Sequence, residues 1–287
     1  IWFQRLTNSN SPLIMKFLLS LLTLISALTV KADIANEGIY LRIVDDADAA
    51  LKAGDFARAE KLYTEAMDLQ PENPGNILLM SNLGMVRFYM GQDSLALVTL
   101  DRAHSIAPRS TTILNNRARV RLVNGLAAEA LEDYNLVIEI APNQADPYFY
   151  RGMIELSGGM IKQAEEDFAT LEKLDPDGEN TQLARARLLV IQQQYAKAIP
   201  YLNRLITKEK SSDYLASRAL CNLMTGNLGE AAEDIADGIE LDPNDGMLYL
   251  YRALLNKQRY QTKQSKLDGQ RAIELGVNPK TVESFLK

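Results

Sequence analysis

The sequence contains very few of the side chains that build metal sites and covalent catalytic centres. Its 287 residues include one cysteine, Cys221, one histidine, His104, and one tryptophan, Trp2. A lone cysteine cannot form an internal disulfide, and one cysteine with one histidine cannot supply the ligands of a structural zinc site. We therefore expect no metal site, no cofactor site and no catalytic residues, and a protein that is not an enzyme.

Basic residues are also outnumbered by acidic ones. The chain has 31 Lys and Arg against 37 Asp and Glu, which gives a formal net charge of -6. Affinity for nucleic acid comes mainly from clustered Lys and Arg, so this balance argues against a nucleic-acid partner. The apolar content of 47% is typical of a folded globular chain.

No apolar run in the sequence is long enough to span a membrane. The longest, residues 17–30, has 14 residues, whereas a transmembrane helix needs about 20. Lys16 precedes this run and Ala32 follows it, a pattern typical of a secretory signal cleaved before Asp33. An uncleaved amphipathic anchor is the alternative. No cysteine lies near the cleavage site to carry a lipid.

These features predict an upstream remnant plus signal peptide over residues 1–32 and a short lead-in over residues 33–39. Removal of residues 1–32 would leave 28 basic and 37 acidic side chains, a net charge of -9. We therefore expect an exported protein, in the bacterial periplasm, with no transmembrane helix in the mature chain. Association with the cell envelope stays open.

The rest of the chain repeats with a period of about 34 residues. Prolines that follow similar tripeptide motifs step by 37, 34, 34 and 67 residues, the last step spanning two repeats; they are Pro71, Pro108, Pro142, Pro176 and Pro243. Seventeen residues before each proline stands a glycine: Gly54, Gly91, Gly125, Gly159 and Gly226. Small residues stand twelve and twenty-four positions before each proline, and a bulky residue eight before it.

Each glycine separates two apolar-periodic halves of helix length. Glycine can adopt the left-handed conformation that ends the first helix, and proline cannot continue the second. The small residues then lie where two antiparallel helices cross closely. The fifth repeat has Gln193 in place of glycine and Lys210 near the place of proline.

This pattern resembles the tetratricopeptide repeat, a 34-residue helix–turn–helix unit. The resemblance covers about residues 40–279 and implies an all-α fold, an α-solenoid that winds into a right-handed superhelix with a concave groove. We expect seven repeats followed by a C-terminal cap at residues 280–287; the repeats are 40–76, 77–110, 111–144, 145–178, 179–211, 212–245 and 246–279.

Two charged series run in phase with the repeats. The arginines step by 34, 34, 33 and 34 residues, and they are Arg117, Arg151, Arg185, Arg218 and Arg252. Sixteen residues after four of them stand Asp133, Asp167, Asp234 and Asp268, whereas the fifth repeat has Tyr201. The arginines could form a comb for an acidic ligand. We favour a structural ladder of ion pairs, because the aspartates would neutralise such a comb.

In the family that the pattern resembles, partner-binding residues come from the inner face of the first helices. The matching positions in repeats two to four hold amide, aromatic and methionine side chains, which suit a peptide backbone and adaptable apolar contacts. They are Asn82, Met85, Phe88, Tyr89, Asn115, Asn116, Arg119, Phe149, Tyr150 and Met153. Some of them could instead pack the next repeat.

Together with the leader pattern, the resemblance implies an exported protein–protein interaction scaffold that binds a peptide or protein partner in its groove. The alternative is a cell-envelope enzyme, or a glycan-binding accessory protein, with a carboxylate or aromatic site in the same groove. Perturbed pKa values of clustered Asp and Glu would favour the enzyme, and aromatic side chains free to stack on sugars would favour glycan binding.

Overall fold

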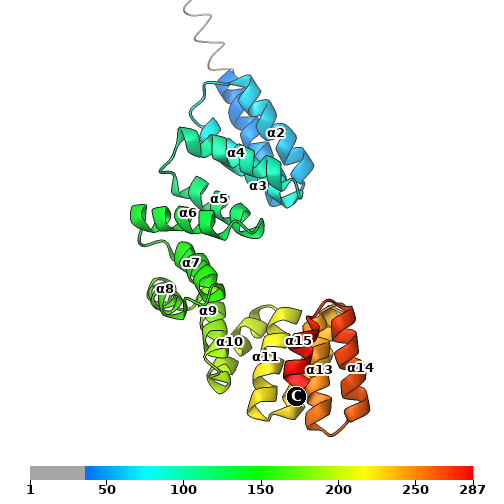
Figure 1. The fold of residues 1–287 in the computed structure, drawn as a ribbon. Helices are drawn as coiled ribbons and strands as arrows, with labels where there is room; N and C mark the ends of the chain where they lie inside the picture. Colours follow the sequence, from blue (N-terminus) through cyan, green and yellow to red (C-terminus); the bar gives the residue numbers. More distant parts are fainter. Residues whose placement is uncertain (1–35, 287) are drawn as a thin grey trace, which may run out of the picture. The chain divides into compact units, whose positions relative to one another are not determined.

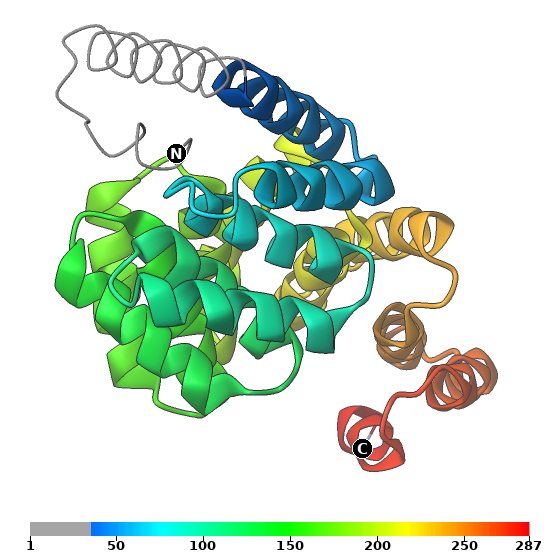
Figure 2. The same cartoon turned by 90° about the horizontal axis from the view of Figure 1, so that it is seen from above.

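A computed structural model describes residues 36–286 of the chain. The predicted leader lies outside these residues. Backbone contacts divide the chain into an N-terminal unit that ends at Ile140 and a C-terminal unit that begins at Ala141, and each is described by itself. The all-α prediction is confirmed, because the described residues form helices joined by short turns and include no strand (Figure 1 and Figure 2).

The N-terminal unit begins with a helix described over residues 36–52, so residues 36–39 of the expected lead-in are already helical. Five further helices follow in this unit: α2 Phe56–Leu69, α3 Asn76–Tyr89, α4 Asp93–Ile106, α5 Thr111–Val123 and α6 Ala127–Ile140. The close pairs include α3 with α4 and α5 with α6. Below, the earlier helix of each pair is called the first helix and the later one the second helix.

The C-terminal unit contains four further pairs and one single helix. The pairs are α7 Ala145–Ser157 with α8 Ile161–Leu174, α9 Glu179–Ile191 with α10 Tyr195–Lys208, α11 Ser212–Thr225 with α12 Leu228–Leu241, and α13 Gly246–Gln258 with α14 Thr262–Glu274. The single helix, α15 Pro279–Leu286, packs against α13 and α14 and covers the last pair.

The turns follow the predicted chemistry. Five glycines after first helices have a positive φ between 73° and 82°: Gly54, Gly91, Gly125, Gly159 and Gly226. In the two repeats without this glycine, Gln193 and Tyr260 occupy the same turn position, each with a φ of 58°. A side chain in this left-handed region costs about 1–2 kcal/mol, so these two turns store strain that the glycine turns avoid.

Close helix crossings explain the small residues. A Cβ on Gly152 would lie 2.5 Å from Cε1 of Phe168, and one on Gly84 would lie 2.6 Å from Cγ of Leu100. Phe168 and Leu100 are fully buried and occupy the bulky position of their own repeats. Because glycine has no Cβ, each of these positions leaves space for the large side chain of the facing second helix.

Among the described junctions between repeats, the one between α10 and α11 is the shortest. Second helices α4, α6, α8 and α12 are followed by a four-residue turn with proline in its second position, but α10 is followed by three residues, 209–211, without proline. First helices α7 and α9 pack together, as do α11 and α13. In contrast, α9 and α11 make little backbone contact, and α11 packs closely on α10 instead.

Candidate functional site

The arginine and aspartate series pair within single repeats. Arg117 donates to Asp133 over 2.9 and 2.5 Å, and Arg151 donates to Asp167 over 2.7 and 2.6 Å. The C-terminal repeats have the same arrangement, with Arg218 on Asp234 at 2.5 Å and Arg252 on Asp268 at 2.7 Å. All four aspartates are buried. Each pair therefore joins the first helix of a repeat to its second helix.

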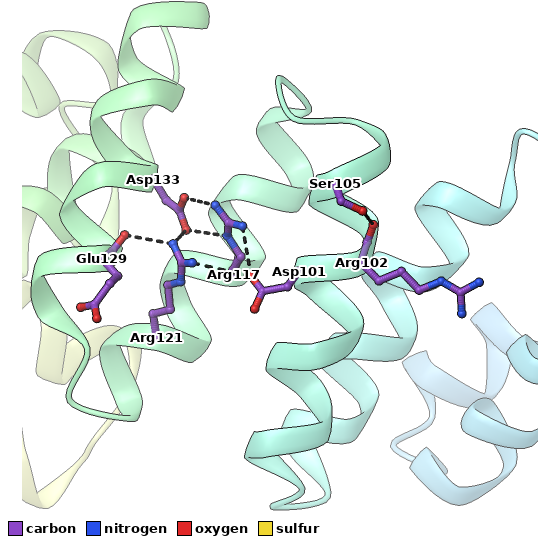
Figure 3. Close-up of polar contacts among 7 residues, drawn as sticks. All are labelled: Asp101, Arg102, Ser105, Arg117, Arg121, Glu129 and Asp133. Atoms are coloured by element: carbon purple, nitrogen blue, oxygen red, sulfur yellow. Dashed lines mark hydrogen bonds and ion pairs between the residues drawn. The ribbon is translucent and has the colours of Figure 1, made fainter.

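Some of these arginines also reach the preceding repeat. Arg117 donates to Asp101 of α4 over 3.1 Å, and Arg121 contacts both Asp101 and Asp133, so two arginines share two aspartates (Figure 3). Arg218 likewise donates to Asn203 of α10 over 2.7 Å. Carboxylate and amide groups of the same or the preceding repeat thus engage these guanidinium groups.

The fifth repeat lacks the aspartate, and its arginine finds another partner. Arg185 pairs with Glu172 on the second helix of the preceding repeat, while its Nε is buried without a hydrogen-bond partner among the described residues. Tyr201, at the aspartate position, lies under the guanidinium of Arg204, which is 5.6 Å from the ring centroid.

A third position contributes to the ladder, and it was not recognised in the sequence. Four residues after the ladder arginine, a donor side chain contacts Oδ2 of the same aspartate. Arg121 does so at 2.7 Å, Asn222 at 3.2 Å and Asn256 at 2.8 Å. The equivalent residue of the α7–α8 repeat is Glu155, whose Oε2 is buried without a hydrogen-bond donor among the described residues.

His104 lies beside the network of Figure 3. Burial lowers the pKa of its imidazole, and the charges of Arg117 and Arg121 lower it further, against the opposing charges of Asp133 and Asp101. Its Nδ1 is buried and has no hydrogen-bond partner in the described part of the chain. These surroundings favour the neutral form of the ring, and its Nδ1 caps no carbonyl group.

The predicted groove residues of the N-terminal unit have mixed roles. Asn82 donates to the hydroxyl of Tyr63 over 3.4 Å, and this hydroxyl donates to Asp48 over 2.5 Å. Asn116 donates to Ser81 over 3.0 Å. Met85 exposes only 6% of its surface and packs in the core. These contacts use Asn82, Asn116 and Met85 within the fold.

Aromatic side chains of the same unit are more accessible. Tyr89 is 46% exposed and stacks on Phe56, with ring centroids 5.2 Å apart. Phe88 is half-buried, and its ring centroid lies 5.7 Å from that of Tyr89. Asn115 and Arg119 are also half-buried. The end of α3 thus offers an aromatic surface.

In the C-terminal unit, Phe149 is buried with 7% exposure and meets Tyr150 edge to face at 5.1 Å. Met153 lines a pocket of about 390 Å³. First helices and their caps supply most of the remaining wall: Leu156 and Ser157 of α7, Leu183, Ala186, Arg187, Val190 and Ile191 of α9, Asp213, Ala216, Ser217 and Leu220 of α11, Met247 and Tyr251 of α13, with Asp245 and Leu202.

The pocket continues the register of the predicted groove. Tyr150 and Met153 stand two residues before and one residue after the small residue of their repeat. The same two offsets in the next repeats give Ala184 and Arg187, Ser217 and Leu220, and Tyr251 and Leu254; four of these six line the pocket. The repeat phase therefore contained the signal, which the sequence prediction followed only through the fourth repeat.

The pocket lies beside the shortened α10–α11 junction. Helix α11 packs on α10 and makes little backbone contact with α9, whereas α13 packs on α11. Side chains that would pack between neighbouring first helices, such as Leu183, Val190 and Leu220, line a cavity instead.

The pocket has few charged groups. Arg187 is exposed and forms no hydrogen bond or ion pair with any described residue, whereas Asp245 uses its Oδ1 to cap α13 at Met247. Burial and the charge of Asp245 raise the pKa of the Tyr251 phenol to about 12. The phenol is therefore neutral at physiological pH and can donate a hydrogen bond. Cys221 is buried nearby in the core, and burial raises its thiol pKa to about 11.

Residues 36–286 contain no cluster of three or more His, Cys, Asp or Glu side chains that could hold a metal ion. Over the same range, no helix is long and apolar enough to cross a membrane.

Comparisons with known proteins agree with the repeat pattern. A family model described as the tetratricopeptide repeat matches residues 44–75 and 183–246. A tetratricopeptide repeat protein from Parabacteroides merdae is 25% identical, with a TM-score of 0.64 over 86% of this chain and 97% of its own. No curated protein matches the sequence.

Two less similar structures share the fold. PilF of Pseudomonas aeruginosa is 17% identical, with a TM-score of 0.65 over 76% of this chain and 99% of its own. A chain of the APC/C hetero-tetramer Cut9–Hcn1 is 14% identical, with a TM-score of 0.73 over 84% of this chain, which spans only 47% of that one.

Proposed function

We propose that this chain, which contains tetratricopeptide repeats, is an exported scaffold that holds a protein or peptide partner against the face formed by its first helices. Proteins built from such repeats are generally interaction scaffolds rather than enzymes. The pocket of about 390 Å³ between first helices of the C-terminal unit is the observation that supports this function. Export rests on the leader pattern in residues 1–32.

The pocket suits an apolar side chain of the partner. Leu183, Val190 and Leu220 form apolar walls, and burying one large aliphatic or aromatic side chain against them contributes about 1.5–3 kcal/mol. Arg187 is available to pair with a carboxylate of the partner. Because helices hold these groups in place, little conformational entropy is lost when a partner binds.

Site-specific photo-crosslinking tests this function. A photoreactive amino acid replaces Leu220 in the pocket or, as a control, Lys162 on the exposed side of α8, in the full chain in its own cell compartment. We expect one adduct of defined mass from position 220 and none from position 162. Ser217→Trp, which fills the pocket, should abolish the adduct, whereas Ala236→Trp on exposed α12 surface should not.

The same adduct at positions 220 and 162, or an adduct that persists in the Ser217→Trp variant, would show that the partner does not use the pocket. Circular dichroism of each variant separates loss of the pocket from loss of the fold.

A further inference from the structure

The α7–α8 repeat differs from three others at one position of the ion-pair ladder. In those repeats, Arg121, Asn222 and Asn256 donate a hydrogen bond to Oδ2 of the buried aspartate. In the α7–α8 repeat the equivalent side chain is Glu155, which in its ionised form has no proton to donate. The second donor of Asp167 is therefore missing when Glu155 is ionised.

The surroundings of Glu155 favour the protonated form of its carboxyl group. Its Oε2 is buried without a hydrogen-bond partner among the described residues, and Asp167 is the side chain with which its carboxyl group can share a hydrogen bond. Burial, and then the charge of Asp167 on α8, raise the pKa of Glu155, with a smaller contribution from Glu166. Arg151, on the same helix, opposes these effects.

The other helix packed on α7 in this unit is α9, and its charged residues are engaged or directed elsewhere. Glu179 pairs with Lys208, Arg185 pairs with Glu172, and Arg187 lines the pocket. Among the charged side chains, Asp167 and Arg151 therefore have the largest effect on the protonation of Glu155.

We propose that Glu155 and Asp167 form a proton-binding site between α7 and α8, in which protonated Glu155 donates to Asp167 the hydrogen bond that Arg121, Asn222 and Asn256 donate in other repeats. The proton resides on Glu155, and Asp167 remains the ionised partner of Arg151. Because Met153 and Leu156 of α7 line the pocket, proton uptake stabilises the helix that forms one pocket wall.

The direction of the pH effect follows from the raised pKa. The added stability is complete below the pKa of an unfolded glutamate, about 4.3, and is lost as the pH rises through the higher pKa of folded Glu155. Glu155→Gln supplies an amide donor, like those of Asn222 and Asn256, and this amide does not titrate. Glu165→Gln removes the same charge from the exposed surface of α8 and is the matched control.

Thermal unfolding of the full chain at pH 4 and pH 7 tests the site. We expect Glu155→Gln to raise the unfolding midpoint at pH 7 by about 2–4 °C, and the gap to close at pH 4. Glu165→Gln should show no gap that depends on pH. In carbon NMR of carboxyl-labelled glutamate, the signals of Glu155 and Glu165 are assigned by their disappearance in the Glu155→Gln and Glu165→Gln variants. The Glu155 signal of the unsubstituted chain should titrate at a higher pH than the Glu165 signal.

Two results would overturn the proposal. The first is a gap between Glu155→Gln and the unsubstituted chain that is equal at pH 4 and pH 7. The second is a Glu155 signal that titrates at or below the midpoint of Glu165, which would show that Asp167 does not share a proton. The NMR titration decides the question even if Glu155→Gln alters stability for another reason.

Discussion

Arg151 and Asp167 meet across the α7–α8 pair through two hydrogen bonds of 2.7 and 2.6 Å, with side-chain exposures of 22% and 6%. Removing one member of such a pair leaves the other charge poorly compensated, at a cost of about 3–5 kcal/mol. Since Arg151 retains some contact with water, we expect Asp167→Ala to cost about 3 kcal/mol in unfolding free energy.

Chemical denaturation measures this cost. Asp177→Ala, in the exposed turn after α8, is the control and should change stability by less than about 0.5 kcal/mol. An unchanged unfolding midpoint in Asp167→Ala would show that the ladder does not stabilise the fold.

The crossing of α7 and α8 gives a second prediction. Gly152→Ala should destabilise the chain by about 1–3 kcal/mol, because the new methyl group would collide with the buried ring of Phe168. Gly229→Ala in α12 adds the same methyl group where nothing lies within 4 Å, so it should be neutral or stabilising. If both variants have equal unfolding free energies, close packing does not explain the small residue.

The strained turns give a third prediction. Gln193→Gly and Tyr260→Gly should each stabilise the chain by about 0.5–1 kcal/mol, because the left-handed strain that glycine removes exceeds the folding cost of the entropy that glycine adds to the unfolded state. Tyr260 is 94% exposed, so its replacement loses little packing. Gly226→Ala should have the opposite effect. Denaturation midpoints that fall in the two glycine variants would contradict this account.

His104 gives a pH dependence opposite in sign to that of Glu155. Its pKa is lowered, so the folded state resists a proton that the unfolded state accepts below about pH 6.5. The N-terminal unit should therefore lose stability as the pH falls from 6.5 to 5. Hydrogen exchange of α4 peptides measures this loss, which should shrink in His104→Gln. An equal loss in that variant would assign the effect to other groups.

The repeat architecture was predictable because its determinants lie within one repeat. The glycine turns, the proline turns and the 16-residue spacing of Arg151 and Asp167 are local features that recur, so each repeat supports the assignment of the others. The role of Glu155 was harder to predict, because it is defined by donors at the equivalent position of three other repeats.

The pocket depends on relations between repeats, and this is why the sequence prediction located the candidate site only in part. The predicted groove includes Met153, but the phase of the repeats does not show that α9 and α11 separate. In the same way, Asn82 has the residue type and register of a contact residue, yet Tyr63 and Asp48 engage it. Whether a side chain is available to a binding partner therefore depends on its contacts with residues of other helices.

The three-residue turn at 209–211 has a genetic consequence. The loss of a single codon between two repeats can leave every helix intact and still change which helices are neighbours. A cavity can therefore arise in one step, before any residue of its wall has changed. In a repeat protein of this kind, linker length is a heritable source of new binding surface.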